Sequence, residues 1–315
     1  MSHSHAHQSQ PVVLIGLGRM GAAMAAHLVE QGIAVHGVDP NAEARTAAAA
    51  DGVTVSATAP EALAAVSAPR IVWLMVPSKL VDTVLDTVTP HLSAGDTVID
   101  GGNSFFKDSQ RRHVALREQG IEFLDCGVSG GIDGARHGAS LMVGGPDDVV
   151  RAYTWLFQAL AIEHGFAHVG GPGAGHYVKM VHNAIEYGMM GAIAEGIHRL
   201  EEQRDALDLD VVAAFDPYEH GSIIESSLVR WLADTYRRPG YLESIAGEVP
   251  RGETEPEMEY LLSEHETPIL AAALAQRVDT RTTPSRVGTL IAAMRNEFGG
   301  HATKPKRTSE RSSDV

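Results

Sequence analysis

The sequence holds a single cysteine, Cys126, among its 315 residues. A lone cysteine excludes a disulfide within the chain and suits a reducing compartment, so a cytoplasmic location is expected. A nucleophilic role for Cys126 is the weaker alternative, because a small residue before a glycine turn explains it without chemistry.

Long apolar runs and positive charge are also scarce. Hydrophobic residues make up 44% of the chain, yet no run of about 18 apolar residues suggests a membrane span. There are 25 Lys and Arg against 40 Asp and Glu, a net charge of −15. This balance argues against nucleic acids and anionic membrane surfaces as partners, and an anionic substrate would need a locally basic pocket. No internal repeat is evident, and the length predicts two domains.

A glycine-rich turn near the N-terminus has the context of a dinucleotide-binding fingerprint. An apolar strand, Pro11–Ile15, runs into Gly16-Leu17-Gly18-Arg19-Met20-Gly21, and a helical run, Ala22–Gln31, follows. The first glycine allows the tight turn, the second lets the backbone approach a pyrophosphate, and the third lets helix and strand pack closely. The pyrophosphate would then lie at the positive end of the helix. A glycine turn without a ligand is the alternative, which the flanking strands disfavour.

The acid that follows selects the cofactor. A second strand, Ala34–Val38, ends at Asp39, 23 residues after the first glycine. A carboxylate there accepts hydrogen bonds from the ribose hydroxyls and repels a 2′-phosphate. Pro40-Asn41 supplies no cation, and Arg45 lies on the next predicted helix. The sequence therefore predicts NAD rather than NADP.

The remaining segments predict an α/β fold, in which an N-terminal doubly wound Rossmann sheet is followed by an all-helical C-terminal domain. Further strands are predicted at Ile71–Val76, Thr97–Asp100, Glu122–Asp125 and Ser140–Gly145, and glycine-rich turns follow at Gly101–Ser104 and Cys126–Gly131. Open α/β sheets place their ligands at such strand ends. Helices are predicted at Gly175–Ala206, Val211–Phe215, Ile223–Tyr236, Glu257–Glu264, Pro268–Arg281 and Ser285–Phe298.

The predicted domain boundary lies in the glycine-rich stretch Gly170–Gly173. Residues 11–172 form the expected NAD-binding domain, and residues 173–302 the expected helical substrate and dimerisation domain. Residues 1–10, with His3, His5 and His7, are expected to be a disordered lead, and residues 303–315 a flexible tail.

Five polar side chains share one face of the helix predicted over Gly173–Gly196. His182, Asn183, Glu186 and Tyr187 follow Lys179 by 3, 4, 7 and 8 positions, so all five project from one face. The other faces are apolar, which predicts a buried helix, and a buried helix carries such a stripe where it lines a cleft. The stripe pairs a possible base with a possible acid. A solvent-facing polar stripe is the alternative.

Together these motifs resemble 6-phosphogluconate dehydrogenase. The matching segments are GLGRMG, DGGNS, DCGVSGG, GASLMVGG, GAGHYVKMVHNAIEYG, Ser285-Arg286 and RNEFGGHA (Arg295–Ala302), and the length resembles the short, NAD-preferring bacterial form. The wider β-hydroxyacid dehydrogenase superfamily shares the glycine fingerprint and a catalytic lysine, but usually lacks the His-Asn-x-x-Glu-Tyr continuation.

The resemblance implies oxidative decarboxylation of 6-phosphogluconate to ribulose 5-phosphate and CO₂ with reduction of NAD, a step of the pentose phosphate pathway. It implies that Lys179 takes the proton of the 3-hydroxyl and then, protonated, stabilises the enolate. Glu186 then protonates the enediol. This chemistry requires that the pKa of the lysine is lowered toward neutrality and that the pKa of the glutamic acid is raised, so that it is protonated when needed.

Binding roles are implied in the same way, with no metal. Cofactor contacts are implied for Gly16, Gly18, Arg19, Met20, Gly21, Asp39, Val76 and Asn103. Contacts to the carboxylate and hydroxyls of the substrate are implied for Asn103, Ser129, Gly130, Gly131, His182 and Asn183. Tyr187, Arg286 and Arg295 match contacts at the phosphate end. In the family the segment with Arg295 and His301 reaches into a partner's site, which implies a homodimer or homotetramer. Plain turn residues and surface cations are the alternatives for these positions.

Two stretches depart from the family pattern. Glu225 stands where the short form usually has an arginine, and Pro250–Pro256 replaces the usual Gly-Glu-Gly-Arg-Trp-Thr loop, where Arg251 is a candidate substitute. Two other functions therefore stay open. One is a related dehydrogenase for another sugar acid or 3-hydroxy acid, and the other is a non-enzymatic NAD sensor, which the Lys179 and Glu186 pair disfavours.

Overall fold

The computed structural model of the protein describes residues 10–306. The predicted N-terminal lead and C-terminal tail fall outside the described residues, apart from Gln10 and residues 303–306. The chain divides into two compact units, Met1–Lys179 and Met180–Val315. The division falls inside one long helix, α9 (Ala174–Glu202), a few residues after the boundary that the sequence predicts.

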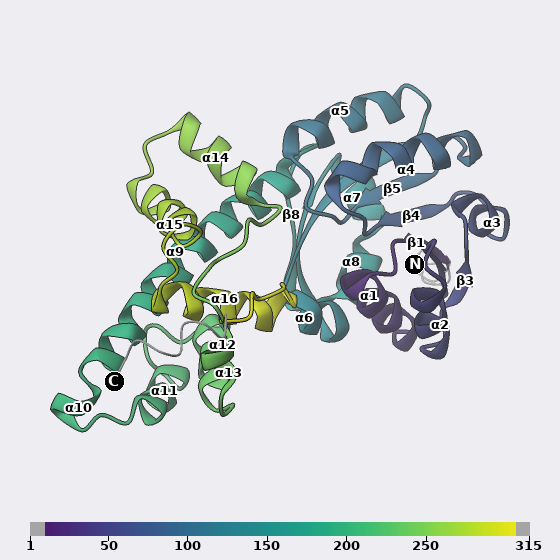
Figure 1. Cartoon of the computed structure of the whole chain (residues 1–315). Helices are drawn as coiled ribbons and strands as arrows, with labels where there is room; N and C mark the ends of the chain where they lie inside the picture. Colours follow the sequence, from purple (N-terminus) through teal and green to yellow (C-terminus); the bar gives the residue numbers. More distant parts are fainter. Residues whose placement is uncertain (1–9, 307–315) are drawn as a thin grey trace. The chain divides into compact units, whose positions relative to one another are not determined.

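The first unit is built on one eight-stranded sheet with the strand order β3-β2-β1-β4-β5-β6-β7-β8 (Figure 1). The strands are β1 (Val12–Ile15), β2 (Val35–Val38), β3 (Thr54–Ser56), β4 (Ile71–Leu74), β5 (Thr97–Asp100), β6 (Glu122–Ser129), β7 (Ala139–Gly144) and β8 (Ala161–Gly170). Neighbouring strands are parallel except β6 and β7, which are antiparallel. The order reverses between β1 and β4, which is the switch point where open α/β sheets bind their ligands.

Helices cover both faces of this sheet. They are α1 (Arg19–Glu30), α2 (Ala42–Ala50), α3 (Ala59–Ala64), α4 (Val81–Val88), α5 (Phe106–Arg117), α6 (Gly131–His137), α7 (Asp147–Ala152) and α8 (Thr154–Leu160), with 3₁₀ turns at Ser78–Leu80 and Thr89–His91. Val12 and Leu14 join the core under α1 and α8, whereas Val13 and Ile15 join the core under α3 and α4. Because successive side chains enter opposite cores, these strands are continuous apolar runs.

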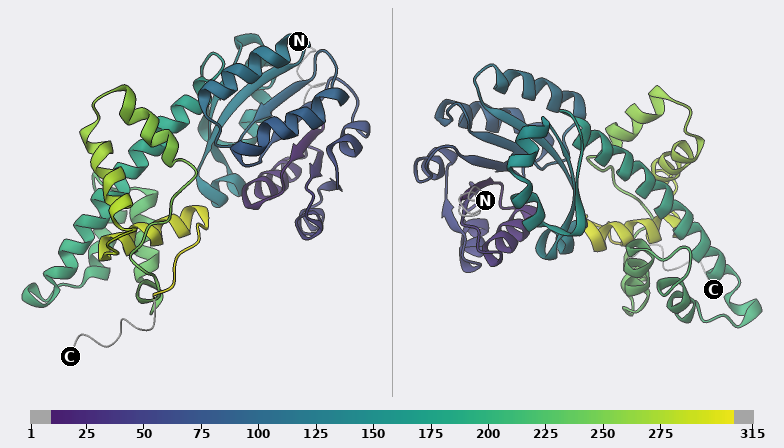
Figure 2. Two further views of the ribbon diagram at one scale, coloured as in Figure 1. Left: turned by 45° about the horizontal axis from the view of Figure 1, so that its top comes forward. Right: turned by 180° about the vertical axis from the view of Figure 1, so that it is seen from behind.

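The second unit is helical and is shown from two further sides in Figure 2. Besides α9, its helices are α10 (Arg204–Leu207), α11 (Val211–Glu219), α12 (Ser227–Tyr236), α13 (Tyr241–Ser244), α14 (Glu255–Glu264), α15 (Pro268–Asp279) and α16 (Arg286–Gly299). Helix α16 is buried from Gly288 to Arg295 and packs against α12 and α13. The segment after α16 returns to α13, where Lys306 N donates to Ser244 O (2.9 Å) and Ala246 N donates to Lys304 O (2.8 Å). Between residues 10 and 306, no helix has both the length and the apolar character to cross a membrane.

The predicted fold class is confirmed, but the bounds of several elements differ from the prediction and one strand is additional. Strand β6 continues to Ser129, where the sequence predicts a turn from Cys126, because residues 125–129 pair with β7. Helix α12 begins at Ser227 rather than Ile223, because Ser226 caps it by accepting the Val229 N–H. Strand β8 was not predicted, because this edge strand is half exposed and shows no apolar alternation.

Candidate active site

The glycine turn after β1 has the shape that a pyrophosphate requires. Gly16 has φ +100°, and a β-carbon there would collide with the carbonyl of Met75, as one on Gly21 would with the carbonyl of Gly16. A β-carbon on Gly18 would meet nothing within 4 Å. The first and third glycines are therefore needed for packing, while the second borders open space. Gly18 is also the N-cap of α1 and has no side chain to cap the helix, so the positive end of the helix lies at this turn.

Asp39 lies at the end of β2 beside this turn. Its Oδ2 accepts the N–H of Leu17 (2.8 Å), and its Oδ1 accepts the N–H of Asn41 (2.8 Å). Each carboxylate oxygen has a second lone pair, so a ribose diol can still bind. The residues present thus fit a dinucleotide, with the turn for its pyrophosphate and Asp39 for its ribose.

Arg45 reaches back to the same place from the second turn of α2. Its Nη1 donates to the carbonyl oxygens of Asp39 (2.7 Å) and Pro40 (2.9 Å). The sequence places Arg45 on a helix, which is right, but gives no sign that its guanidinium returns to the strand end.

A buried ion pair holds the turn that carries Asn103. Asp100, at the end of β5, accepts the Gly102 N–H (3.1 Å), the Ser104 hydroxyl (2.7 Å) and Arg112 Nη1 (3.2 Å). Asp100 and Arg112 are both buried, whereas Asn103 is exposed. Sequence analysis did not single out Asp100 or Arg112, although a charged residue at the end of an apolar strand is a usable signal. Val76 also borders this turn, because a β-carbon on Gly102 would lie 2.9 Å from its carbonyl oxygen.

Ser129 and the two following glycines form the junction of β6 and α6. Ser129 ends the strand, Gly130 has φ +116° as the N-cap of α6, and Gly131 begins that helix. Three of the strand-end turns that the sequence predicts as ligand sites, after β1, β5 and β6, therefore belong to one sheet.

The start of α9 is fixed to the sheet by Asp125. This buried carboxylate on β6 accepts the N–H of Gly173 (2.7 Å) and the N–H of His176 (2.9 Å). It therefore caps the helix from a neighbouring strand and opposes the positive end of the dipole. Glycines allow backbone contact here, since a β-carbon on Gly144 would lie 2.6 Å from Gly175 N.

Lys179 lies one turn further along α9. A β-carbon on Gly127 would overlap the Cβ of Lys179, so the lysine stem packs directly on β6. Lys179 is only 8% exposed. His176, one turn earlier, is also buried and its Nδ1 lies 2.7 Å from the Ser109 hydroxyl oxygen.

The polar stripe of α9 is not a surface stripe. Lys179, Asn183 and Tyr187 are buried, and His182 and Glu186 are half buried. His182 Nδ1 lies 3.3 Å from Asn183 Oδ1 and 3.9 Å from Glu186 Oε2. The exposed residues of this stretch include the apolar Val178, Ile185 and Met189. The alternative of a solvent-facing polar stripe is therefore wrong.

Two buried arginines surround Tyr187. The Arg277 guanidinium lies 3.3 Å from the centre of the Tyr187 ring, and the tyrosine hydroxyl lies 3.0 Å from Thr254 Oγ1. Arg295 donates from Nη1 to the carbonyl of Pro250 (2.8 Å), and a β-carbon on Gly252 would lie 3.1 Å from its Nη2 and 3.4 Å from the Tyr187 hydroxyl. Burial lowers the pKa of Arg277 to about 10, and burial also lowers the pKa of Arg295.

Arg277 and Arg295 thus bring two positive charges to the surroundings of Tyr187. After burial, the charge of Arg295 also lowers the pKa of Arg277, and the charge of Arg281 lowers that of Arg295, whereas Tyr187, Glu186 and Glu255 act on both arginines in the opposite direction. In the part of the chain that the structure describes, the buried Nε of Arg277 has no hydrogen-bond partner. Such a pair suits a dianionic group. Sequence analysis missed Arg277 and Thr254, and the only signal was an arginine within the apolar run of α15.

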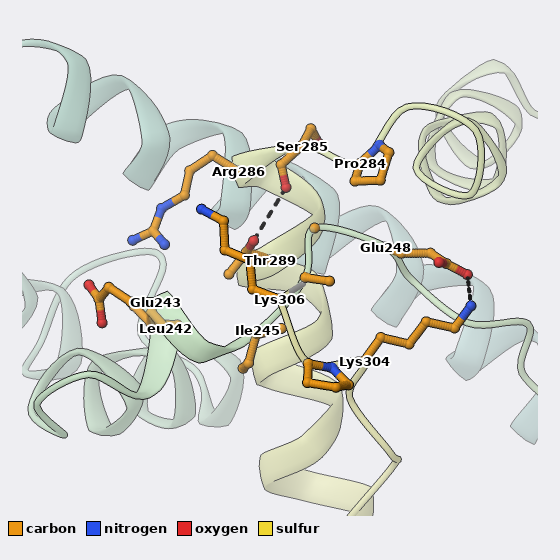
Figure 3. A pocket seen from close by; sticks show the side chains of 13 residues that line it. Leu242, Glu243, Ile245, Glu248, Pro284, Ser285, Arg286, Thr289, Lys304 and Lys306 are labelled. Carbon is orange, nitrogen blue, oxygen red and sulfur yellow. Dashed lines mark hydrogen bonds and ion pairs between the residues drawn. The ribbon is translucent and has the colours of Figure 1, made fainter. Parts of the chain in front are cut away.

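Arg286 is not brought to this cluster. Its Nε donates to Glu201 Oε1 (3.1 Å) and Oε2 (2.9 Å), and the same carboxylate accepts the Tyr236 hydroxyl (2.6 Å). Glu201 follows Tyr187 by 14 positions, which is about 21 Å along the helix axis. Arg286 instead lines a cavity of about 600 Å³ beside Lys304 and Lys306 (Figure 3).

Three other predicted positions lie apart. Exposed His301 packs edge-on against Phe298, with ring centres 5.8 Å apart. Glu225 accepts the Gly221 N–H (2.7 Å) and so closes a surface turn. Arg251 lies 3.5 Å from Glu255 and Glu259 on an exposed surface. In the described residues, no cluster of His, Cys, Asp and Glu could hold a metal ion.

Comparisons with known proteins agree over most of the chain. The profile described as the NAD binding domain of 6-phosphogluconate dehydrogenase matches residues 11–170, and that of the C-terminal domain of the same enzyme matches residues 175–246. A Haloferax volcanii protein named NAD(+)-dependent, decarboxylating 6-phosphogluconate dehydrogenase is 38% identical over 298 residues, which cover 93% of this chain and 98% of that one. The Bacillus subtilis protein YqeC, provisionally named for the same dehydrogenase, is 40% identical over 295 residues, 93% of this chain and 99% of its own.

Solved structures share the architecture. The 6-phosphogluconate dehydrogenase of Plasmodium falciparum, studied with NADP+ and with 6-phosphogluconate, has a TM-score of 0.73 and 28% identity over 86% of this chain and 63% of its own. A 3-hydroxyisobutyrate dehydrogenase of Mycobacterium tuberculosis has a TM-score of 0.69 over 91% of this chain and 99% of its own, at 24% identity. The second likeness concerns the fold alone.

Proposed function

Because the chain belongs to the 6-phosphogluconate dehydrogenase family, we propose that it oxidises and decarboxylates 6-phospho-D-gluconate with NAD, giving D-ribulose 5-phosphate and CO₂. The family predicted from the motifs is confirmed, and the chain is an oxidoreductase with an NAD-binding domain. The observation that carries the finer proposal is the buried Arg277 and Arg295 pair at Tyr187, which suits a phosphate that a plain hydroxy acid lacks.

The proposed reaction begins with Lys179. The glycine turn and Asp39 would hold NAD, which would supply the acceptor for the hydride of C3, and Lys179 takes the proton of the 3-hydroxyl. The amine of Lys179 is a group that can act as a general base, and its side chain is buried rather than free in solvent. Its stem rests on Gly127 and its helix is capped by Asp125, so its position is fixed before substrate binds.

Decarboxylation follows from the 3-keto acid. The bond between C1 and C2 breaks, its electron pair forms the enolate, and the proton held by Lys179 passes to the enolate oxygen. Glu186 then donates a proton to the carbon that carried the carboxylate, while Lys179 takes back the proton of the enol oxygen, which leaves the ketone of ribulose 5-phosphate. Glu186 lies seven positions after Lys179 on α9, about 10 Å along the axis, which places the acid beyond the base on one helical face.

The remaining groups of the substrate are each assigned to binding residues. We assign the carboxylate and hydroxyls to Asn103, Ser129, Gly130, Gly131, His182 and Asn183, as the family resemblance implies. The phosphate is assigned to Tyr187, Arg277 and Arg295, and Arg286 is left out because Glu201 holds it. Arg19, Met20 and Val76 remain proposed cofactor contacts with the glycine turn and Asp39.

A second copy of the chain is the proposed partner. The exposed apolar residues Val178, Ile185 and Met189 follow one side of α9, where a subunit interface would cover them. The family resemblance places Arg295 in a partner's site, but its hydrogen bond to Pro250 and its contact with Gly252 lie within its own chain. A homodimer is therefore proposed without assigning Arg295 across it.

The second candidate is a related dehydrogenase for another 3-hydroxy acid, favoured by the changed loop Pro250–Pro256 and by Glu225. The deciding experiment measures NAD reduction with 6-phosphogluconate and with gluconate, and records CO₂ release in parallel. The proposal expects reduction and equimolar CO₂ only with the phosphorylated acid. Equal rates with both acids, or reduction without CO₂, would favour the second candidate.

A further inference from the structure

A cation and an anion meet at the adenosine end of the site. The carboxylate of Asp39 faces the glycine turn through Leu17 N, while the guanidinium of Arg45 is bound to the carbonyl oxygens of Asp39 and Pro40. The negative charge belongs to the Asp39 side chain, and the positive charge of Arg45 is held at the Asp39 backbone by a hydrogen bond of 2.7 Å. The strand end that carries the ribose-selecting acid therefore also carries an arginine.

The guanidinium is held and still has donors to offer. A guanidinium has five N–H donors, and the contacts of Arg45 involve only Nη1. Its Nε and Nη2 have no protein partner among residues 10–306. The side chain is half buried, so part of its rotamer freedom is already lost in the free protein.

We propose that Arg45 is the residue that recognises a 2′-phosphate on the adenosine ribose, and that the charge of Asp39 masks this recognition in the native protein. In dinucleotide-binding folds the acid at the end of the second strand binds the 2′-hydroxyl, and a nearby arginine accommodates the 2′-phosphate. A fixed guanidinium whose Nε–Nη2 edge is free can bind a phosphate in bidentate fashion through that edge. The inference rests on the NAD-binding domain and not on the identity of the sugar acid.

The proposal differs from the expectation based on the sequence. The sequence shows no cation in Pro40-Asn41 and places Arg45 on the next helix, so it offers no group beside Asp39 that would bind a 2′-phosphate. With Arg45 in place, removal of the Asp39 charge alone is sufficient for a 2′-phosphate to bind.

Direct binding of NAD and NADP, measured by calorimetry without any sugar acid, tests this. We expect Asp39→Ser to lower the Kd for NADP by roughly tenfold or more, as loss of one nearby like charge implies. Adding Arg45→Gln should remove that gain, while Arg45→Gln alone changes the Kd for NAD less than roughly threefold. Asp39→Asn retains an acceptor for Leu17 N and covers the case in which Asp39→Ser fails to fold. Arg117→Gln, an exposed arginine in the last turn of α5, is the matched loss of charge.

Two results would overturn the proposal. In one, the double variant binds NADP as tightly as Asp39→Ser. In the other, Arg45→Gln weakens NAD and NADP equally, which means that the arginine stacks on the adenine. A failed assay with 6-phosphogluconate bears on the proposed function only, because neither Kd involves that substrate.

Discussion

Gly127 and Lys179 are in contact without room for a single added carbon, because a β-carbon on the glycine would overlap the Cβ of the lysine. The glycine lies in the middle of β6, and the lysine lies in the second turn of α9. The position of the proposed base is therefore determined by the backbone of the sheet.

Gly127→Ala should displace Lys179. We expect kcat to fall by roughly 10²-fold, since a shift of about 1 Å has such an effect on a positioned group. The free energy of unfolding should drop by about 1–3 kcal/mol through overpacking. Gly171→Ala is the control, because a β-carbon at Gly171 meets nothing within 4 Å. An unchanged kcat in Gly127→Ala, with the alanine seen in a crystal structure, would contradict the contact.

Lys179→Met and Glu186→Ala test the base and the acid. Lys179→Met should lower kcat at least roughly 10²-fold while the protein still binds substrate, because a general base is lost. Glu186→Ala should slow protonation of the enediol more than hydride transfer, which single-turnover kinetics can separate. Glu195→Ala, on the exposed part of the same helix, should behave as wild type. Near-normal turnover in Lys179→Met would remove Lys179 from the mechanism.

Arg277→Met tests the phosphate end. KM for 6-phosphogluconate should rise by roughly 10-fold or more, since a charge-assisted contact contributes about 1.5–3 kcal/mol. Because gluconate has no phosphate, Arg277→Met should not change any residual rate with gluconate. The comparison variant is Arg286→Gln. Because Glu201 holds Arg286, this variant should leave KM for 6-phosphogluconate near the wild-type value. If Arg286→Gln raises KM and Arg277→Met does not, the assignment must be reversed.

The native protein should prefer NAD. Asp39 lies where the adenosine ribose is expected, and two like charges about 4 Å apart near a surface repel by roughly 4 kcal/mol before screening. A third of that is about tenfold in specificity, so kcat/KM for NAD should exceed that for NADP by at least roughly one order of magnitude. Equal or better values with NADP would refute this role of Asp39.

Mixing two inactive variants tests whether Arg295 serves the active site of its own chain or that of a partner. Because its hydrogen bond to Pro250 lies within one chain, mixing Arg295→Ala subunits with Lys179→Met subunits should restore no activity. Subunit exchange must be demonstrated, for example by mass spectrometry of the mixed oligomers. Recovery toward roughly a quarter of wild-type activity would instead show that Arg295 serves the partner's site.

The sequence predicts the cofactor turn and the polar face of α9, because each follows from a pattern of residues that are close together in the chain. The spacing of Gly16, Gly18 and Gly21 after an apolar strand predicts the cofactor turn, and the periodicity from Lys179 to Tyr187 predicts the polar face of α9. Both depend on residues that are close in the chain.

The remaining parts depend on packing between distant segments. The apolar run around Arg277 does not show what the arginine contacts, and only the fold places it against Tyr187, 90 positions earlier. Likewise, nothing near Asp125 shows that its carboxylate will cap a helix 48 positions later. Strand β6 was predicted too short for the same reason, since its last residues are stabilised by pairing with β7.

Cys126 lies in β6 between Asp125 and Gly127, with no exposed surface, and burial raises the pKa of its thiol. A thiol reagent can therefore reach it only when this strand separates from its neighbours. A fluorescent or spin label attached to a cysteine introduced on the surface would thus report on that position alone, with the native cysteine left in place. The slow modification of Cys126 itself would time the opening of the sheet beneath Lys179.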